Sequence, residues 1–192
     1  MYKNLDYASI EMQCPDLNKT PIHHLPTKYS IRDFQPGDER VWLAIQKLAD
    51  KYNVITEALF YQEFGNQIQI IKQRQLYLLN PSKQTIGTST AWFTMSGSRP
   101  NWGRVHWVAI VPSEQGKGLA KPLLSFTCRR LCDLGHSKAY LTTANNRIAA
   151  INLYLKFGFQ PIITTKDQLE IWTSLESKLR EPIPWEGINF PE

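Results

Sequence analysis

Residues 105–134, VHWVAIVPSEQGKGLAKPLLSFTCRRLCDL, form the stretch that decides the fold. Its first part, 105–111, is apolar and rich in β-branched and aromatic residues, which is typical of a buried strand. Pro112 has no N–H to donate to a neighbouring strand, so the strand is expected to end there. From Leu119 onward apolar residues recur every four positions, which indicates the buried face of a helix. The pattern therefore predicts a strand, a glycine-bearing loop and a helix.

The loop, Gln115–Ala120, has the chemistry of an anion site. The first turn of a helix presents unpaired N–H groups and the positive end of the helix dipole. Gly116 and Gly118 lack a Cβ, so a phosphate or pyrophosphate can approach the backbone closely. The spacing matches neither a Walker A loop nor G-x-G-x-x-G. A plain glycine turn entering a helix is the alternative interpretation.

Two segments together resemble the GNAT superfamily of acetyl-CoA-dependent N-acyltransferases. The first is Q-x-x-G-x-A at 115–120, preceded by a strand that reads V-A-I-V-P, and the second is AINLYLKFGF at 150–159. The resemblance implies an α/β fold with a mixed, mostly antiparallel sheet, helices on both faces, and strands four and five parallel and splayed. We expect an N-terminal arm (1–28), an acyltransferase domain (29–176) and a C-terminal tail (177–192).

The resemblance also implies coenzyme A, as acetyl-CoA, for the cofactor. The loop would hold the pyrophosphate, and the backbone of the strand before it would bond the pantetheine amides as an added strand does. Many family members have asparagine where this chain has Arg147, so Arg147 or Asn146 is expected to take that role. The expected cofactor-binding residues are Val108, Ala109, Ile110, Gln115, Gly116, Lys117, Gly118, Leu119, Ala120, Lys121, Asn146, Arg147 and Tyr154.

Two residues are candidates for proton transfer. Tyr154 matches the family tyrosine that often acts as general acid beside the sulfur, and a phenol is protonated at neutral pH. His106 occupies a position where some members place a base, with water as the alternative. Side chains alternate along a strand, so Arg104, His106 and Val108 are expected on one face. Arg104 and Trp107 are the expected acceptor-binding residues.

The rest of the chain reads as a set of shorter elements. The remaining expected strands are Tyr29–Phe34, Leu76–Leu79, Thr85–Met95, Lys138–Thr143, Phe159–Ile163 and Leu169–Leu175, the last two as a closing pair, with a turn at Ser96–Gly103. The remaining expected helices are one capped by Asp38 with Val41, Trp42, Ile45 and Leu48 on one face, one from Thr56 to Phe64, and Ile148–Phe157. Trp42, Phe60, Tyr61 and Phe64 are candidate acceptor-pocket walls, or ordinary core.

Length, charge and the search for targeting segments limit the classes of protein and partner that we expect. A chain of 192 residues fits one domain, and a formal charge of +5 without any Lys/Arg run predicts no nucleic-acid partner. No signal peptide or membrane span is recognised, so we expect a cytoplasmic protein with no membrane partner. No metal is implied. The sequence predicts acetyl transfer to a primary amine of a small molecule or peptide, and leaves a homodimer open. A non-catalytic acyl-CoA-binding module and a basic nucleic-acid-binding domain are the alternatives.

Overall fold

The computed structural model describes residues 7–94, 99, 101–186 and 188. The strands are β1 (Ser9–Cys14), β2 (Ser30–Asp33), β3 (Gln75–Leu79), β4 (Thr85–Phe93), β5 (Trp102–Ile110), β6 (Lys138–Ala144) and β7 (Gln160–Pro161). The α-helices are α1 (Asp38–Ala49), α2 (Glu57–Phe64), α3 (Ile68–Arg74), α4 (Ala120–Asp133), α5 (Ile148–Lys156) and α6 (Lys166–Glu176). Met95, half of the predicted turn at 96–103, residues 1–6 of the arm and parts of the tail lie outside the described residues. Trp102 and Gly103, predicted in that turn, belong to β5.

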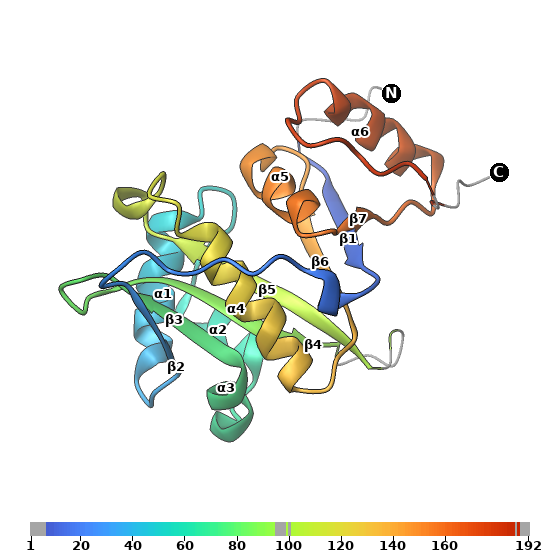
Figure 1. The fold of residues 1–192 in the computed structure, drawn as a ribbon. Helices are drawn as coiled ribbons and strands as arrows, with labels where there is room; N and C mark the ends of the chain where they lie inside the picture. The colour runs from blue at the N-terminus through green and yellow to red at the C-terminus, as the bar shows by residue number, and fades with distance from the viewer. Residues whose placement is uncertain (1–6, 95–98, 100, 187, 189–192) are drawn as a thin grey trace.

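The strands form one seven-stranded sheet in the order β2-β3-β4-β5-β6-β1-β7 (Figure 1). Every neighbouring pair is antiparallel except β5 and β6, which are parallel. Parallel strands need a crossover, and α4 supplies it. The predicted mixed, mostly antiparallel sheet is therefore confirmed, and so is the strand–loop–helix unit around residues 105–134.

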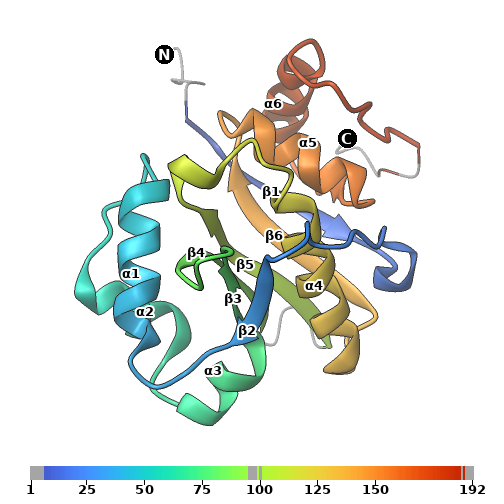
Figure 2. The ribbon, with the colours of Figure 1, turned by 60° about the vertical axis from the view of Figure 1, so that its left-hand side comes forward.

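Helices cover both faces of the sheet, as Figures 1 and 2 show. On β4, the Trp92 ring lies 5.4 Å from the Phe64 ring of α2, and the Ser89 hydroxyl lies 2.8 Å from that of Thr127 on α4. Strand residues three positions apart point to opposite faces, so α2 and α4 pack on opposite sides. Two apolar clusters fill the interior. One holds side chains of α1, α2 and α3 together with Leu119 and Leu123 at the start of α4, and the other is shared by α4, α5, α6 and β1.

The parallel strands separate soon after they meet. β5 and β6 pair only from Trp102↔Lys138 to Arg104↔Tyr140. Further along β5, Trp107 has φ +49°, a left-handed conformation that is unusual for a large residue. Trp107 lies in a β-bulge, where β5 has one more residue than β4. His106 pairs with Thr90, but Ala109, three residues later, pairs with Thr88, only two residues away. The predicted splay of strands four and five is thus present, with a backbone irregularity inside it.

The bulge overturns one expectation about side-chain direction. Thr88 and Thr90 are two residues apart and share a face, so their partners Ala109 and His106 share that face as well. Val108 therefore points to the other side of the sheet from His106. The prediction that His106 and Val108 share a face is wrong, because simple alternation fails across an extra residue.

The N-terminal segment belongs to the sheet. Residues 9–14 form β1, which lies between β6 and β7, with Ile10, Met12 and Cys14 facing the core at 2% exposure or less. The interpretation of residues 1–28 as an extended arm or loop is therefore wrong for this stretch. The alternation of S-I-E-M-Q-C is a strand pattern, and the sequence prediction passed over it.

The C-terminal elements also differ from expectation. Residues 169–175 lie in the helix α6, not in a strand, with Ile171, Trp172 and Leu175 buried at helical spacing. Of the predicted strand 159–163, only Gln160–Pro161 is a strand, and it pairs with β1. The segment after α6 packs on the molecule, since Ile183 belongs to the core. β7 therefore pairs with β1, and not with residues 169–175 as the predicted closing pair of strands would require.

Smaller differences concern the first three helices. α1 begins at Asp38, whose carboxylate accepts from the Gln35 N–H before the helix and does not cap it. Trp42 and Ile45 are buried as predicted, but Leu48 is 61% exposed. α3 was not predicted at all. α2 runs to Phe64, as the sequence predicted, and is followed by Gly65 with φ +69°.

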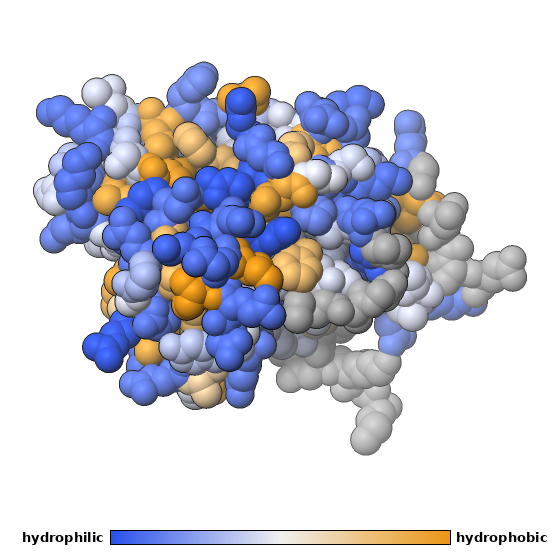
Figure 3. Space-filling model, turned by 90° about the horizontal axis from the view of Figure 1, so that it is seen from below, coloured by the Kyte–Doolittle hydropathy of each residue, from blue (hydrophilic) through white to orange (hydrophobic). Residues whose placement is uncertain are grey.

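The surface seen from below is predominantly hydrophilic, with hydrophobic side chains in small groups between polar ones (Figure 3). Large apolar side chains that are exposed come from separate parts of the chain, such as Ile22, Val54 and Phe126. Within the described ranges, each helix is too short or too polar to cross a bilayer.

Candidate active site

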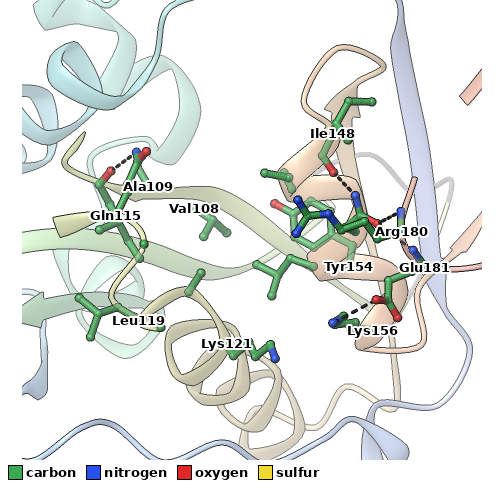
Figure 4. Close-up of a pocket in the computed structure, with 18 of the residues that line it drawn as sticks. Val108, Ala109, Gln115, Leu119, Lys121, Ile148, Tyr154, Lys156, Arg180 and Glu181 are labelled. Atoms are coloured by element: carbon green, nitrogen blue, oxygen red, sulfur yellow. Dashed lines mark hydrogen bonds and ion pairs between the residues drawn. The ribbon is translucent and has the colours of Figure 1, made fainter. Parts of the chain in front are cut away.

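A cavity of about 940 Å³ lies where β5 and β6 diverge. Figure 4 shows its walls: the end of β5 and the loop after it on one side, α5 and residues 180–181 on the other. It is lined by Val108, Ala109, Ile110, Glu114, Gln115, Gly116, Gly118, Leu119, Ala120, Lys121, Ile148, Ala149, Ala150, Asn152, Leu153, Tyr154, Lys156, Arg180 and Glu181. Most residues predicted to bind the cofactor are thereby brought together around one space.

The glycine loop is open to this cavity. Gly116 and Gly118 have φ +77° and +76°, conformations that side chains rarely adopt, and a Cβ added at either would meet nothing within 4 Å. The empty space in front of both backbones is the room an anion needs at the start of α4. The loop therefore has the geometry of the predicted cradle, and the residues present fit the pyrophosphate of coenzyme A.

Gln115 holds the loop against the end of β5. Its side-chain Nε2 donates to the Ile110 carbonyl at 2.8 Å, as Figure 4 shows. The N–H of the same peptide unit, that of Val111, donates to the Ile86 carbonyl on β4, so both sides of this peptide are hydrogen-bonded. Lys117 is not among the lining residues, and its ammonium group pairs with the carboxylate of Glu114, which does line the cavity, at 2.9 Å.

Tyr154 lies in the wall of the cavity, on α5. Its ring is 8% exposed and packs 5.9 Å from the ring of Phe159. Burial raises the pKa of the phenol to about 12, only partly opposed by the charge of Arg147. Among the residues that the structure describes, none hydrogen-bonds the Tyr154 hydroxyl. It is thus a protonated donor with its hydrogen bond available.

Arg147 and Asn146 stand apart from the cavity. The Arg147 guanidinium bonds both oxygens of Asp50, at 3.1 and 3.0 Å, and lies 5.1 Å from the centre of the Tyr52 ring. Asn146 has a buried Oδ1 without a partner in the described chain. Neither lines the cavity, so the expectation that one of them contacts the cofactor has no support from this geometry.

Several lining residues escaped the sequence prediction. Ile148, Asn152 and Lys156 recur every four residues on α5, so helical spacing from Tyr154 could have marked the neighbouring face. Arg180 and Glu181 come from the segment after α6, and no pattern in the sequence points to them.

On the opposite face of β5 from Val108, His106 forms a buried pair with Glu63 of α2. His106 Nε2 lies 2.8 Å from Glu63 Oε2. Burial lowers the pKa of His106 to about 4, although Glu63 opposes the shift. The hydrogen bond from His106 in turn lowers the pKa of Glu63. The pair is therefore a neutral imidazole and a carboxylate at neutral pH.

Hydrogen-bond chemistry fixes the proton in this pair. An ionised carboxylate only accepts, so the single ring proton of neutral His106 lies on Nε2 and Nδ1 keeps its lone pair. Glu63 was not predicted from the sequence; its spacing from Phe60 and Phe64 gave no sign that it would reach β5.

The other predicted acceptor residues, Arg104 and Trp107, lie near this pair, and like His106 they are not among the residues that line the cavity. Arg104 has a buried Nε without a partner among described residues and lies 5.8 Å from the centre of the Tyr140 ring. Trp107 packs edge-on against Trp42 at 5.2 Å. Of the four candidate pocket walls, Trp42, Phe60 and Phe64 form the core, and Tyr61 is 50% exposed.

The fold and the cavity combine in one arrangement: a crossover helix begins at an anion cradle, and Tyr154 faces the cradle across the gap between two splayed strands. Comparisons with known proteins agree. Residues 35–159 match the acetyltransferase (GNAT) family. The chain therefore belongs to this family.

Individual relatives are more distant. The chain is 30% identical over 144 residues to a mycothiol acetyltransferase of Arthrobacter sp. (strain FB24), covering 72% of this chain and 45% of that protein. It thus spans about half the length of the curated relatives it matches. A GCN5-related N-acetyltransferase from Sphaerobacter thermophilus has a similar fold, with TM-score 0.66 and 20% identity over 80% of this chain and 48% of that one.

A smaller enzyme shows the same fold over most of its own length. The ribosomal-protein-S18-alanine N-acetyltransferase from Escherichia coli superposes with TM-score 0.56 and 19% identity, covering 72% of this chain and 86% of that one.

Proposed function

We propose that this protein transfers the acetyl group of acetyl-CoA to a primary amine of a small molecule or peptide by direct attack. The observation that carries the proposal is the cavity between β5 and β6, with the glycine cradle at one wall and Tyr154 at the other. The name of the curated relatives, mycothiol acetyltransferase, supports acetyl transfer. Their acceptor is not carried over, because the chain covers less than half of their length.

The residues of the chain divide the chemistry between them. The N–H groups at the start of α4 bind the pyrophosphate, and the backbone of Val108–Ile110 orients the pantetheine arm. Attack forms the bond from the amine nitrogen to the acetyl carbon and breaks the bond from that carbon to sulfur. His106 does not line the cavity, so in this proposal the amine reaches His106 from the opposite face of β5, where Nδ1 takes the proton of the amine. Tyr154, in the cavity wall, donates its phenolic proton to the departing thiolate. Glu63 holds His106 in the required tautomer.

The direct test is a screen of primary amines with acetyl-CoA, following the release of free thiol. Amino acids, polyamines, amino sugars and short peptides with free N-termini cover the acceptor classes. We expect at least one class to give thiol release that depends on both acceptor and protein. Acetyl-CoA binding without turnover on any amine would contradict the proposal and favour a non-catalytic module.

The His106–Glu63 pair predicts an unusual pH dependence. A base acts in its neutral form, so its contribution is present above its pKa and is lost as pH falls through about 4, not through 6.5. We expect His106→Gln to lower kcat/KM about tenfold or more above that pH. The parent-to-variant ratio should then fall towards one at acid pH. A ratio that stays constant throughout would assign deprotonation to water or another group.

Glu63→Gln tests the positioning role of the carboxylate. Gln can donate as well as accept, so it no longer fixes the His106 proton on Nε2. We expect kcat to fall while KM for acetyl-CoA stays unchanged, because Glu63 does not line the cavity. Glu57→Gln, an exposed carboxylate on the same helix, is the matched control and should retain parental kcat.

A further inference from the structure

The cavity wall that faces the cradle carries a positively charged residue, Arg180, from a part of the chain that the family match does not include. Arg180 lies in the segment after α6, beyond residue 159, where the match ends. It lines the cavity together with Lys121 and Lys156 (Figure 4). Figure 4 shows Arg180 on the side of α5, across the cavity from Gln115 and Leu119 of the loop.

The position of Arg180 is fixed by its backbone. Asn152 of α5 accepts two hydrogen bonds on its Oδ1, from the N–H of Arg180 at 2.7 Å and from that of Glu181 at 2.9 Å. The Asn152 amide group also donates to the Ile148 carbonyl at 2.8 Å, which holds the side chain in place. Ile183, just beyond, is buried in the core. The segment is therefore a built part of the wall.

The charges around the cavity leave a positive surplus. The two acidic lining residues are both paired: Glu181 with Lys156 at 3.0 Å, and Glu114 with Lys117 at 2.9 Å. Within the described part of the chain, the side chains of Lys121 and Arg180 have no ion-pair or hydrogen-bond partner. Two unpaired cations on the rim of one cavity favour an anionic ligand group with more than one charge.

The cradle already accounts for one anionic group, at Gly116–Ala120. Arg180 lies on the opposite wall, so it favours a second phosphate carried elsewhere on the same ligand. We propose that Arg180, assisted by Lys121, binds the 3′-phosphate of the coenzyme A ribose. This inference rests on the proposed use of coenzyme A. It adds that the segment after α6 makes the protein selective for a 3′-phosphorylated nucleotide.

The test compares two ligands on the parent and on variants of the full chain. Calorimetric titration with coenzyme A and with 3′-dephospho-coenzyme A gives four dissociation constants for each parent–variant pair. We expect Arg180→Gln to weaken coenzyme A binding about tenfold, or about 1.4 kcal/mol. Its affinity for 3′-dephospho-coenzyme A should stay within about twofold of the parental value, since one contact is already missing there.

Two further variants serve as controls. Lys178→Gln removes the same charge two residues earlier, at an exposed position outside the cavity, and should change neither affinity. Arg180→Lys keeps the charge and should recover part of the discrimination between the ligands.

Three results would overturn the inference. One is equal weakening of both ligands by Arg180→Gln, which would place Arg180 at the pyrophosphate or in a structural role. Another is parental affinity for both. A third is a parent that binds both ligands equally well. A parent that binds neither ligand would instead contradict the proposed function itself.

Discussion

Replacing Tyr154 with phenylalanine should lower kcat about a hundredfold or more, the usual cost of losing general acid catalysis. Negative charge builds on sulfur only as the C–S bond breaks, so the phenol acts mainly in the transition state. With its pKa raised to about 12, it stays protonated across the whole working range. The loss should therefore be the same at every neutral pH, and KM for acetyl-CoA should change little.

In this structure the substitution removes the hydroxyl group without disturbing other contacts of Tyr154. Since no described residue hydrogen-bonds the Tyr154 hydroxyl, its removal leaves no polar group of the protein without a partner. The ring and its contact with Phe159 remain. Thermal stability and coenzyme A affinity are measured alongside kcat as controls. A kcat within about threefold of the parent would return Tyr154 to a packing role, because general acid catalysis counts for far more.

Gly118→Asp should abolish most coenzyme A binding, with affinity reduced at least tenfold, about 1.4 kcal/mol, in a calorimetric titration. The added side chain would occupy the open space in front of the loop and place a negative charge where the pyrophosphate binds. Gly118→Ala separates the two causes, because it adds the Cβ without the charge and should cost less.

Gly135→Asp is the matched control for backbone strain. Gly135 has φ +87° with open space around its Cα, as Gly118 has, but it follows the C-terminal end of α4 and does not line the cavity. The two variants carry similar strain, so only Gly118→Asp should lose coenzyme A. A folded Gly118→Asp protein with parental affinity would place the pyrophosphate elsewhere.

Local patterns predicted the centre of this molecule well. The buried strand, the glycine loop and the helix after it follow from residues close together in the chain, because each pattern needs only its own hydrogen bonds and one apolar face. That the loop and Tyr154 meet at one cofactor was implied by the resemblance to the GNAT family, since no local pattern joins residues so far apart in the chain. The His106 position was predicted, but its partner Glu63 was not, since 43 residues separate them.

The outer elements could not be predicted from local sequence patterns, because contacts between distant parts of the chain determine their structure. Short amphipathic segments such as 169–175 suit a strand or a helix equally well, and packing against the core decides between them. The extra residue at Trp107 reversed the direction of Val108, which alternation alone could not reveal. Arg180 reaches the cavity because Asn152 holds its backbone, a contact between residues 28 positions apart.

The place of β1 has a consequence for how the chain folds. The Ala8 N–H donates to the Asn145 side chain although the two residues are 137 positions apart, and β1 separates β6 from β7 in the sheet. During synthesis, β1 therefore has no partner in this sheet until β6 follows it. Closing so long a loop is entropically costly, and non-local strand pairing is slow. The half of the sheet that carries α5, and with it Tyr154, is thus completed last, and catalytic competence should arise in one late step.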